Sequence, residues 1–218
     1  MTKSIKILTF GLFLTFINSV NAQHVFKKGT LLVSISGGNT NANYTTTEIS
    51  TGKICKNVNM DGIRDPLFFE YGISNRFGIG FSSGSDLFDI NPKTFYNING
   101  ETPLNKNLVA KTSELTFDIN YHAFVRRNLD VSLYTSIGSF GVTLKEKEDK
   151  YVANGGIIRA GINARYYFLK RLGVLGMASV YSADSSPKDL KGNTFGQGYK
   201  TNITGYALEF GFCFRIIR

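Results

Sequence analysis

Apolar and polar residues alternate along eight separate segments of the chain, and the connections between these segments run long, short, long, short to the C-terminus. Alternation with a period of two predicts β-strands that have one apolar and one polar face. In an up-and-down barrel every second connection emerges on the same side, so alternating loop length indicates two different sides. The predicted strands are 29–37, 67–74, 77–85, 115–125, 129–138, 156–168, 172–181 and 205–216.

The connections between the predicted strands fall into two classes. Three short ones are tight turns at Asn75-Arg76, Arg127-Asn128 and Lys170-Arg171. The longer ones are a polar loop after residue 37, a second loop to about Asn107, a charged loop over 145–150, and a loop after residue 181. The strand over 115–125 alternates most regularly, whereas the glycine-rich strand over 172–181 leaves its facing open.

Side-chain volume decides which face of these strands points outward. The polar face is mostly Gly, Ser, Thr and Asn, which fit a narrow lumen, whereas the apolar face is too bulky for the interior of an eight-stranded barrel. Its large members are Phe69, Tyr71, Phe117, Tyr121, Tyr166, Phe168, Tyr206, Phe210, Phe212 and Phe214. The sequence therefore predicts an all-β, eight-stranded antiparallel up-and-down transmembrane β-barrel. A secreted lipocalin-like barrel is the weaker alternative, because its surface would be rich in Lys and Glu.

The chain begins with the features of an export signal. Lys3 and Lys6 precede an apolar run, and Val20-Asn21-Ala22 is a small-residue cleavage site. We expect a signal peptide over residues 1–22 and one barrel domain over 23–218. The formal net charge of +9 is scattered along an exported chain, so we expect no nucleic-acid partner.

Two cysteines raise the question of a disulfide in an oxidising compartment. Cys55 lies in the first long loop and Cys213 lies near the far end of the last strand. They should sit on opposite sides of the membrane, and bonded cysteines need Cα atoms within about 7 Å. We predict that no disulfide joins them.

Several ionisable residues occupy the polar, lumen-facing positions near mid-height of the predicted barrel. A charge inside a membrane is costly without a partner, so we expect an ion-pair and water network that closes and stiffens the barrel. The alternative is a gated ion or proton path, since four carboxylates face two arginines. The residues are Glu70, Glu114, Asp118, Arg159, Arg165 and Glu209.

An enzymatic function needs a nucleophile and a base within hydrogen-bond reach. After the signal the chain has only His24 and His122, and His122 lacks the serine two residues further on that barrel lipid A deacylases use. A lone histidine on a polar strand face is more often structural, although Asp130 and Ser132 on the next strand could approach it. The sequence shows no metal-ligand cluster or phosphate loop, so we expect no enzyme, no metal and no cofactor.

Basic residues are concentrated at the termini and the short turns, whereas the long loops are close to charge-balanced. A basic periplasmic rim that faces anionic headgroups explains this distribution. An acidic periplasmic partner is a less favoured explanation. The residues are Lys27, Lys28, Arg76, Arg126, Arg127, Lys170, Arg171 and Arg218.

Nearly the whole chain after the signal resembles the small outer-membrane β-barrel proteins of the OmpA, OmpX and PorT-like group, in its Bacteroidetes form. The resemblance lies in the signal end, the opening KGTLLV, the hairpin YGISNRFGIG and the ending GYALEFGFCFRIIR. It implies that Phe210, Phe212 and Phe214 form the signal read by the barrel-assembly machinery, although this chain ends in Arg218 instead of an aromatic residue.

Together these features predict a monomeric barrel in the outer membrane of a Gram-negative bacterium, with both termini periplasmic. Its partners would be membrane lipid, lipopolysaccharide and the assembly machinery. We expect a structural or surface-interaction role. The alternatives are a narrow transporter of small or hydrophobic solutes, a lipid A-modifying enzyme, and an accessory of protein secretion.

Overall fold

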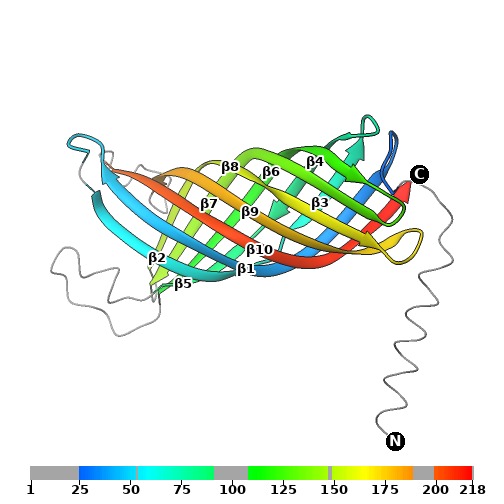
Figure 1. Cartoon of the computed structure of the whole chain (residues 1–218). Helices are drawn as coiled ribbons and strands as arrows, with labels where there is room; N and C mark the ends of the chain where they lie inside the picture. Colours follow the sequence, from blue (N-terminus) through cyan, green and yellow to red (C-terminus); the bar gives the residue numbers. More distant parts are fainter. Residues whose placement is uncertain (1–24, 53, 91–107, 147–148, 189–198, 218) are drawn as a thin grey trace, which may run out of the picture.

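The computed structural model describes residues 25–52, 54–90, 108–146, 149–188 and 199–217. The expected signal peptide therefore lies outside the described residues. Within the described residues no helix is long and apolar enough to cross a membrane. The described chain is built from β-strands that wind around a single axis (Figure 1).

The ten strands occupy eight positions around the barrel, and we call each of these positions a stave. Two staves each consist of two strands separated by one interruption. The first interruption contains Pro66, which has no N–H to donate to a neighbouring strand, and the second is at Ser85. The strands are β1 (Leu31–Glu48), β2 (Ile54–Arg64), β3 (Leu67–Gly72), β4 (Phe77–Gly84), β5 (Asp86–Ile90), β6 (Leu108–Val125), β7 (Leu129–Glu146), β8 (Asp149–Tyr167), β9 (Leu172–Lys188) and β10 (Tyr199–Ile217).

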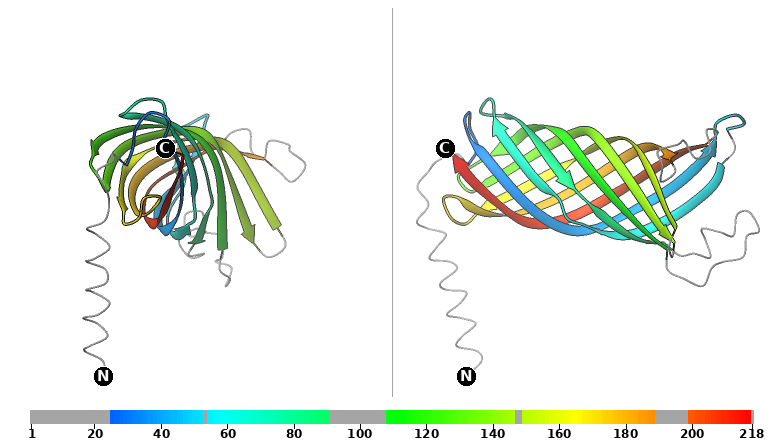
Figure 2. Two further views of the ribbon diagram at one scale, coloured as in Figure 1. Left: turned by 90° about the vertical axis from the view of Figure 1, so that its right-hand side faces the viewer. Right: turned by 180° about the vertical axis from the view of Figure 1, so that it is seen from behind.

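The sheet closes into a ring in which every neighbouring pair is antiparallel. β1 pairs with β10 over its whole length, and on its other side it pairs first with β3 and then with β2. β6 likewise pairs with both β4 and β5. The staves are steeply inclined to the barrel axis (Figure 2), as closure of a sheet requires. The predicted fold class is confirmed.

The two ends of the barrel differ. The turn end carries the three short connections, residues 73–76, 126–128 and 168–171, and the last residues of β10. The loop end is the opposite end, where the β1–β2 hairpin lies (Figure 1). The predicted short turns are confirmed.

An apolar belt encircles the half of the barrel nearest the turn end. On β10 the belt spans eleven residues, from Tyr206 to Ile216, and the six outward ones are large and apolar. On β6 it spans nine residues, from Leu115 to Ala123. A strand needs about 9–11 residues to cross a bilayer. The prediction that the bulky face points outward is therefore confirmed; Phe210, for example, is 76 % exposed.

Beyond the belt the barrel continues as an extension with the opposite polarity. Its outward positions on β1 and β2 are mostly Asn, Thr and Asp, as at Asn39, Asn57 and Asp61. Its interior is an apolar cluster: Ala42, Tyr44, Val58, Met60, Phe88, Ile90, Ala110, Phe140, Val142, Ala153, Ile157, Tyr181, Ala183 and Ile203. The extension is thus polar outside and apolar inside, like a water-soluble barrel.

This extension corrects the predicted loops. Residues 38–48 and 54–64 were expected to be a polar loop, but they are paired strands. Most of the predicted charged loop over 145–150 is also strand, because β7 and β8 stay in register to Glu146 and Asp149. Residues 182–188 of the predicted loop after residue 181 also belong to a strand, because β9 continues to Lys188; residues 189–198 lie outside the described residues. The alternation is weak in these segments because the outward residues are mostly Asn and Thr and the inward ones include small side chains.

The two cysteines lie far apart. Cys213 pairs in register with Ser34, whereas Cys55 lies beside Thr46 and Thr47, twelve residues further along β1. That separation is about 40 Å along the strand. Cys213 is free and buried, which confirms the prediction that no disulfide joins the two.

Candidate functional site: two charged layers in the lumen

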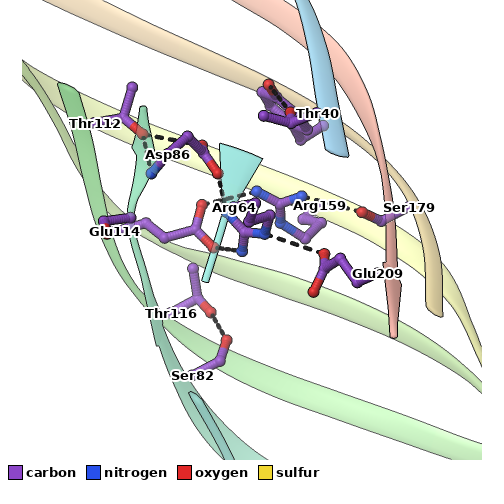
Figure 3. A network of polar contacts seen from close by, with 12 residues as sticks. Thr40, Arg64, Ser82, Asp86, Thr112, Glu114, Thr116, Arg159, Ser179 and Glu209 are labelled. Atoms are coloured by element: carbon purple, nitrogen blue, oxygen red, sulfur yellow. Dashed lines mark hydrogen bonds and ion pairs between the residues drawn. The ribbon is translucent and has the colours of Figure 1, made fainter. Parts of the chain in front are cut away.

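Arg64 is the centre of a charged layer near the loop end of the belt. Its guanidinium contacts three carboxylates: Nη1 lies 2.9 Å from Asp86 Oδ1, Nε lies 3.1 Å from Glu209 Oε1, and Nη2 pairs with Glu114 Oε1 (Figure 3). Arg159 Nη2 binds the other oxygen of Glu114 at 2.8 Å. We call these five residues the loop-end layer; their side chains are 2 % exposed or less.

Hydroxyl groups complete the coordination of the loop-end layer. Thr112 Oγ1 donates to Asp86 Oδ2 at 2.9 Å, and Ser36 Oγ donates to Glu209 Oε2 at 2.9 Å. Arg159 Nη1 donates to Ser179 Oγ at 3.0 Å (Figure 3). The guanidinium of Arg159 also lies 4.5 Å from the ring centre of Tyr181, so the loop-end layer adjoins the apolar cluster inside the extension.

A second charged layer lies nearer the turn end and is centred on His122. Its Nδ1 lies 2.7 Å from Asp130 Oδ1 and its Nε2 lies 2.6 Å from Glu70 Oε1. Arg165 binds the second oxygen of each carboxylate, at 3.0 Å from Asp130 and 2.7 Å from Glu70. These four residues form the turn-end layer. Carboxylates only accept hydrogen bonds, so a ring with two N–H donors satisfies both contacts of His122.

Glycines on the inner face make room for these side chains. Gly38 is the register partner of both Arg64 and Glu209, so it lies between the two residues that pair across it. A Cβ on Gly84 would meet the Arg64 guanidinium at 3.1 Å, and one on Gly78 would meet Glu70 Oε1 at 2.2 Å. The lumenal glycines thus leave space for the charged side chains of neighbouring strands.

The sequence-selected lumenal residues divide between the two layers. Glu114, Arg159 and Glu209 lie in the loop-end layer, and Glu70 and Arg165 lie in the turn-end layer. Asp118 belongs to neither and instead accepts hydrogen bonds from Ser82 Oγ at 3.1 Å and Thr116 Oγ1 at 2.9 Å. Instead of one set near mid-height, the charges form two levels, separated by about 27 Å along β6 between residues 114 and 122.

The sequence does not single out Arg64 and Asp86 as lumenal charges, and it predicts a structural role for His122, with Asp130 as a residue that could approach it. Arg64 and Asp86 flank the two stave interruptions, in segments whose sequence predicts loops. A signal was present, because Val58, Met60 and Arg64 continue one inward face of β2. Asp130 approaches His122 as anticipated, whereas Ser132 Oγ has no protein partner within the described residues.

The N-terminal segment packs against the turn-end layer inside the barrel. Phe26 is 1 % exposed and stacks on the His122 ring with 3.3 Å between ring centres and 13° between planes. Val25, Phe26, Leu32, Tyr167 and Cys213 form an apolar cluster at this position. Gly29 turns the chain into β1 with φ of 83°, a conformation that favours glycine. Arg215 Nη1 donates to the Val25 carbonyl at 3.2 Å and holds the segment in place.

We expect Phe26→Ala to lower the free energy of unfolding by about 3 kcal/mol, because it removes a buried ring and uncovers the turn-end layer. The measurement is urea unfolding in lipid vesicles followed by circular dichroism, since the chain has no tryptophan. The control is Phe124→Ala, whose ring is 41 % exposed on the outer wall. Equal losses for the two variants would contradict a closing role for Phe26.

The chemistry available to this site is limited by its enclosure. Both ring nitrogens of His122 are bonded to carboxylates, and its side chain has no exposed surface. Within the described ranges no group of three or more His, Cys, Asp or Glu side chains could hold a metal ion. The arrangement holds opposite charges together in a buried interior, where such contacts are stronger than in water.

Comparisons with known proteins place the fold. The sequence matches no protein-family model and no curated protein. Its structure is similar to the outer membrane protein OprG from Pseudomonas aeruginosa, with a TM-score of 0.50 and 12 % identity, covering 88 % of this chain and 97 % of OprG. The structure is also similar to Neisserial surface protein A, with a TM-score of 0.50 and 8 % identity, covering 84 % of this chain and 97 % of that protein. The outer membrane protein AlkL in lipid bilayers has a TM-score of 0.51 and 11 % identity, covering 88 % of this chain and 92 % of AlkL. The chain thus has the fold of small integral outer-membrane β-barrel proteins.

Proposed function

We propose that this protein is a closed outer-membrane barrel whose role is to anchor and display a rigid polar surface outside the bilayer. The observation that carries the proposal is the loop-end layer, in which Arg64 joins carboxylates from three other strands across the lumen. A network that ties opposite walls together at nearly zero exposure leaves no wide water path at that level. The turn-end layer and the Phe26 cluster add two further barriers.

The display role follows from the extension. The extension repeats the design of a soluble barrel, with an apolar interior that includes Phe88 and Ile203, both 0 % exposed. Such a packed core keeps the walls rigid well beyond the belt. Its outward Asn, Thr and Asp side chains are suited to hydrogen bonding with water, lipopolysaccharide sugars or a protein surface. Loops held on a rigid scaffold are where barrels commonly carry recognition.

We propose the orientation in which the turn end faces the periplasm. Lys27, Lys28, Arg76, Arg127 and Arg171 are all exposed at that end, where they would meet anionic headgroups. The extension then points away from the cell, and the N- and C-termini of the chain are both periplasmic. Within this proposal the protein is a monomer, and its last strand, which carries Phe210, Phe212 and Phe214, is the segment that the assembly machinery recognises.

A non-enzymatic role is part of the proposal. Catalysis on a lipid would need His122 to reach a nucleophile and the substrate, but its ring is covered by Phe26 and bonded at both nitrogens. Substrate could reach it only if the N-terminal segment left the lumen. We therefore assign His122 to the structure of the turn-end layer.

Single-channel recording in planar lipid bilayers tests the closed lumen. We expect the purified protein to insert without steady conductance of nanosiemens scale, because the two charged layers and the apolar cluster around Phe26 close its interior. Heat-modifiable mobility of the same sample in gel electrophoresis is the control that the barrel is folded. Steady nanosiemens conductance from folded protein would overturn the closed-lumen proposal and favour a transporter.

A further inference from the structure

The lipid-facing wall of β8, β9 and β10 contains a hollow in the apolar belt. Its volume is about 540 Å³, within the roughly 300–1,000 Å³ range of ligand pockets. The lining is apolar or aromatic and lies on the outside of the barrel, not in the lumen. The side chains that shape it are Ala164, Tyr166, Val174, Phe210 and Phe212, with Gly176 at its floor.

Small residues between large ones create this hollow. Ala164 and Gly176 are register partners on β8 and β9, and they leave a depression between Tyr166 and the two phenylalanines of β10. A Cβ on Gly176 would meet only the Phe210 ring, at 3.7 Å, so the space above the glycine is open. In a membrane such a depression is filled by hydrocarbon, because an empty one would forfeit dispersion contacts.

Positive charge gathers at the turn-end mouth of the hollow. Leu129, which also lines it, pairs in register with Tyr166 and stands two residues after Arg127. Arg171 stands three residues before Val174 on the other side. Both arginines are exposed, as are Arg126 and Lys170, and the turns 126–128 and 168–171 contain no acidic residue. The apolar hollow and the cationic residues at its mouth therefore lie next to each other on one face of the barrel.

We propose that this face binds one anionic phospholipid, with an acyl chain in the hollow and its phosphate at Arg127 and Arg171. The proposal rests on the membrane insertion proposed above. Guanidinium groups bind phosphate oxygens through paired hydrogen bonds, and a net negative headgroup adds attraction that a zwitterionic one lacks. The site would select its lipid in the leaflet that meets the short turns.

Native mass spectrometry of the folded protein tests the proposal. The protein is released from vesicles of equimolar phosphatidylglycerol and phosphatidylcholine. We expect one retained phosphatidylglycerol, favoured about tenfold over phosphatidylcholine. Ala164→Leu fills the hollow and should abolish retention. Its matched control is Ala178→Leu, an equally outward alanine on β9 that does not line the hollow, and it should retain the lipid.

A second pair of variants tests the headgroup. Arg127→Gln with Arg171→Gln should reduce the preference for phosphatidylglycerol to near unity, whereas Arg76→Gln, in the β3–β4 turn, should leave it unchanged. Equal retention of both lipids by the unmodified protein, or equal behaviour of the two leucine variants, would overturn the proposal. If the unmodified protein forms a dimer and only Ala164→Leu fails to do so, the hollow holds a second copy of the chain and the proposal is overturned. Failure of the unmodified protein to insert into vesicles would instead contradict the proposed function.

Discussion

Replacing Arg64 by methionine is expected to lower the free energy of unfolding by about 3–5 kcal/mol, the range for breaking a buried ion pair by removing one partner. Methionine fills much of the same space but leaves Asp86, Glu114 and Glu209 without their shared cation. Only Glu114 keeps another, because Arg159 holds its second oxygen. The remaining two carboxylates would have to take up protons or water inside the barrel.

Urea unfolding in vesicles, followed by circular dichroism, measures this loss. The matched control is Arg76→Met, which removes an exposed arginine at the turn end and should cost less than about 1 kcal/mol. A double variant that adds Glu209→Gln should recover part of the loss, because one of the unpaired charges is then gone. If Arg64→Met and Arg76→Met were equally stable, Arg64 would not be the centre of the network.

The belt could be predicted from the sequence because its alternation has high contrast. On β6, Phe117 and Ile119 point outward and Asp118 and Asn120 point inward, so a period of two is visible residue by residue. Short turns that contain Asn, Arg or Lys mark the ends of these strands. Bulk then fixes the facing of the belt strands, since an eight-stranded lumen cannot hold all the large side chains of their apolar face.

The extension could not be predicted in the same way because its contrast is reversed and weaker. There Asn41 and Asn43 point outward and Ala42 and Tyr44 point inward, so the run looks like a polar loop unless both faces are counted separately. Pro66 also divides the second stave, which separates Arg64 from the strand that follows. Arg64 therefore lies in a segment whose composition predicts a polar loop and not a strand with a lumenal face.

Partners within the lumen are a property of the closed ring, which no local pattern encodes. Glu70 and Arg165 are ninety-five positions apart and meet only because the staves curve around a common axis. Sequence alternation places both side chains inside, but the strand tilt and stagger decide which charges share a level. The division into two layers, with Asp118 between them bound to hydroxyls, follows from that stagger.

Gly38→Ala is expected to disrupt closure of the barrel and to cost about 4 kcal/mol or more. A Cβ on Gly38 would lie 2.0 Å from the Leu208 carbonyl oxygen and 2.6 Å from the Glu209 Cα, so β1 and β10 could not keep their present separation. The added methyl would also enter the space across which Arg64 and Glu209 pair. Ring closure and the loop-end layer thus depend on the same glycine.

Gly37→Ala is the matched control, because it adds the same methyl group one position earlier on the same strand. Its Cβ would point outward and come no closer than 3.7 Å to the Arg64 carbonyl oxygen, an ordinary contact. After refolding into vesicles, Gly37→Ala should give the same fraction of heat-modifiable folded protein as the unmodified chain, whereas Gly38→Ala should give little. If the two variants folded equally well, the β1–β10 pairing would tolerate a side chain at position 38. Gly38 would then not be required for the close approach of these two strands.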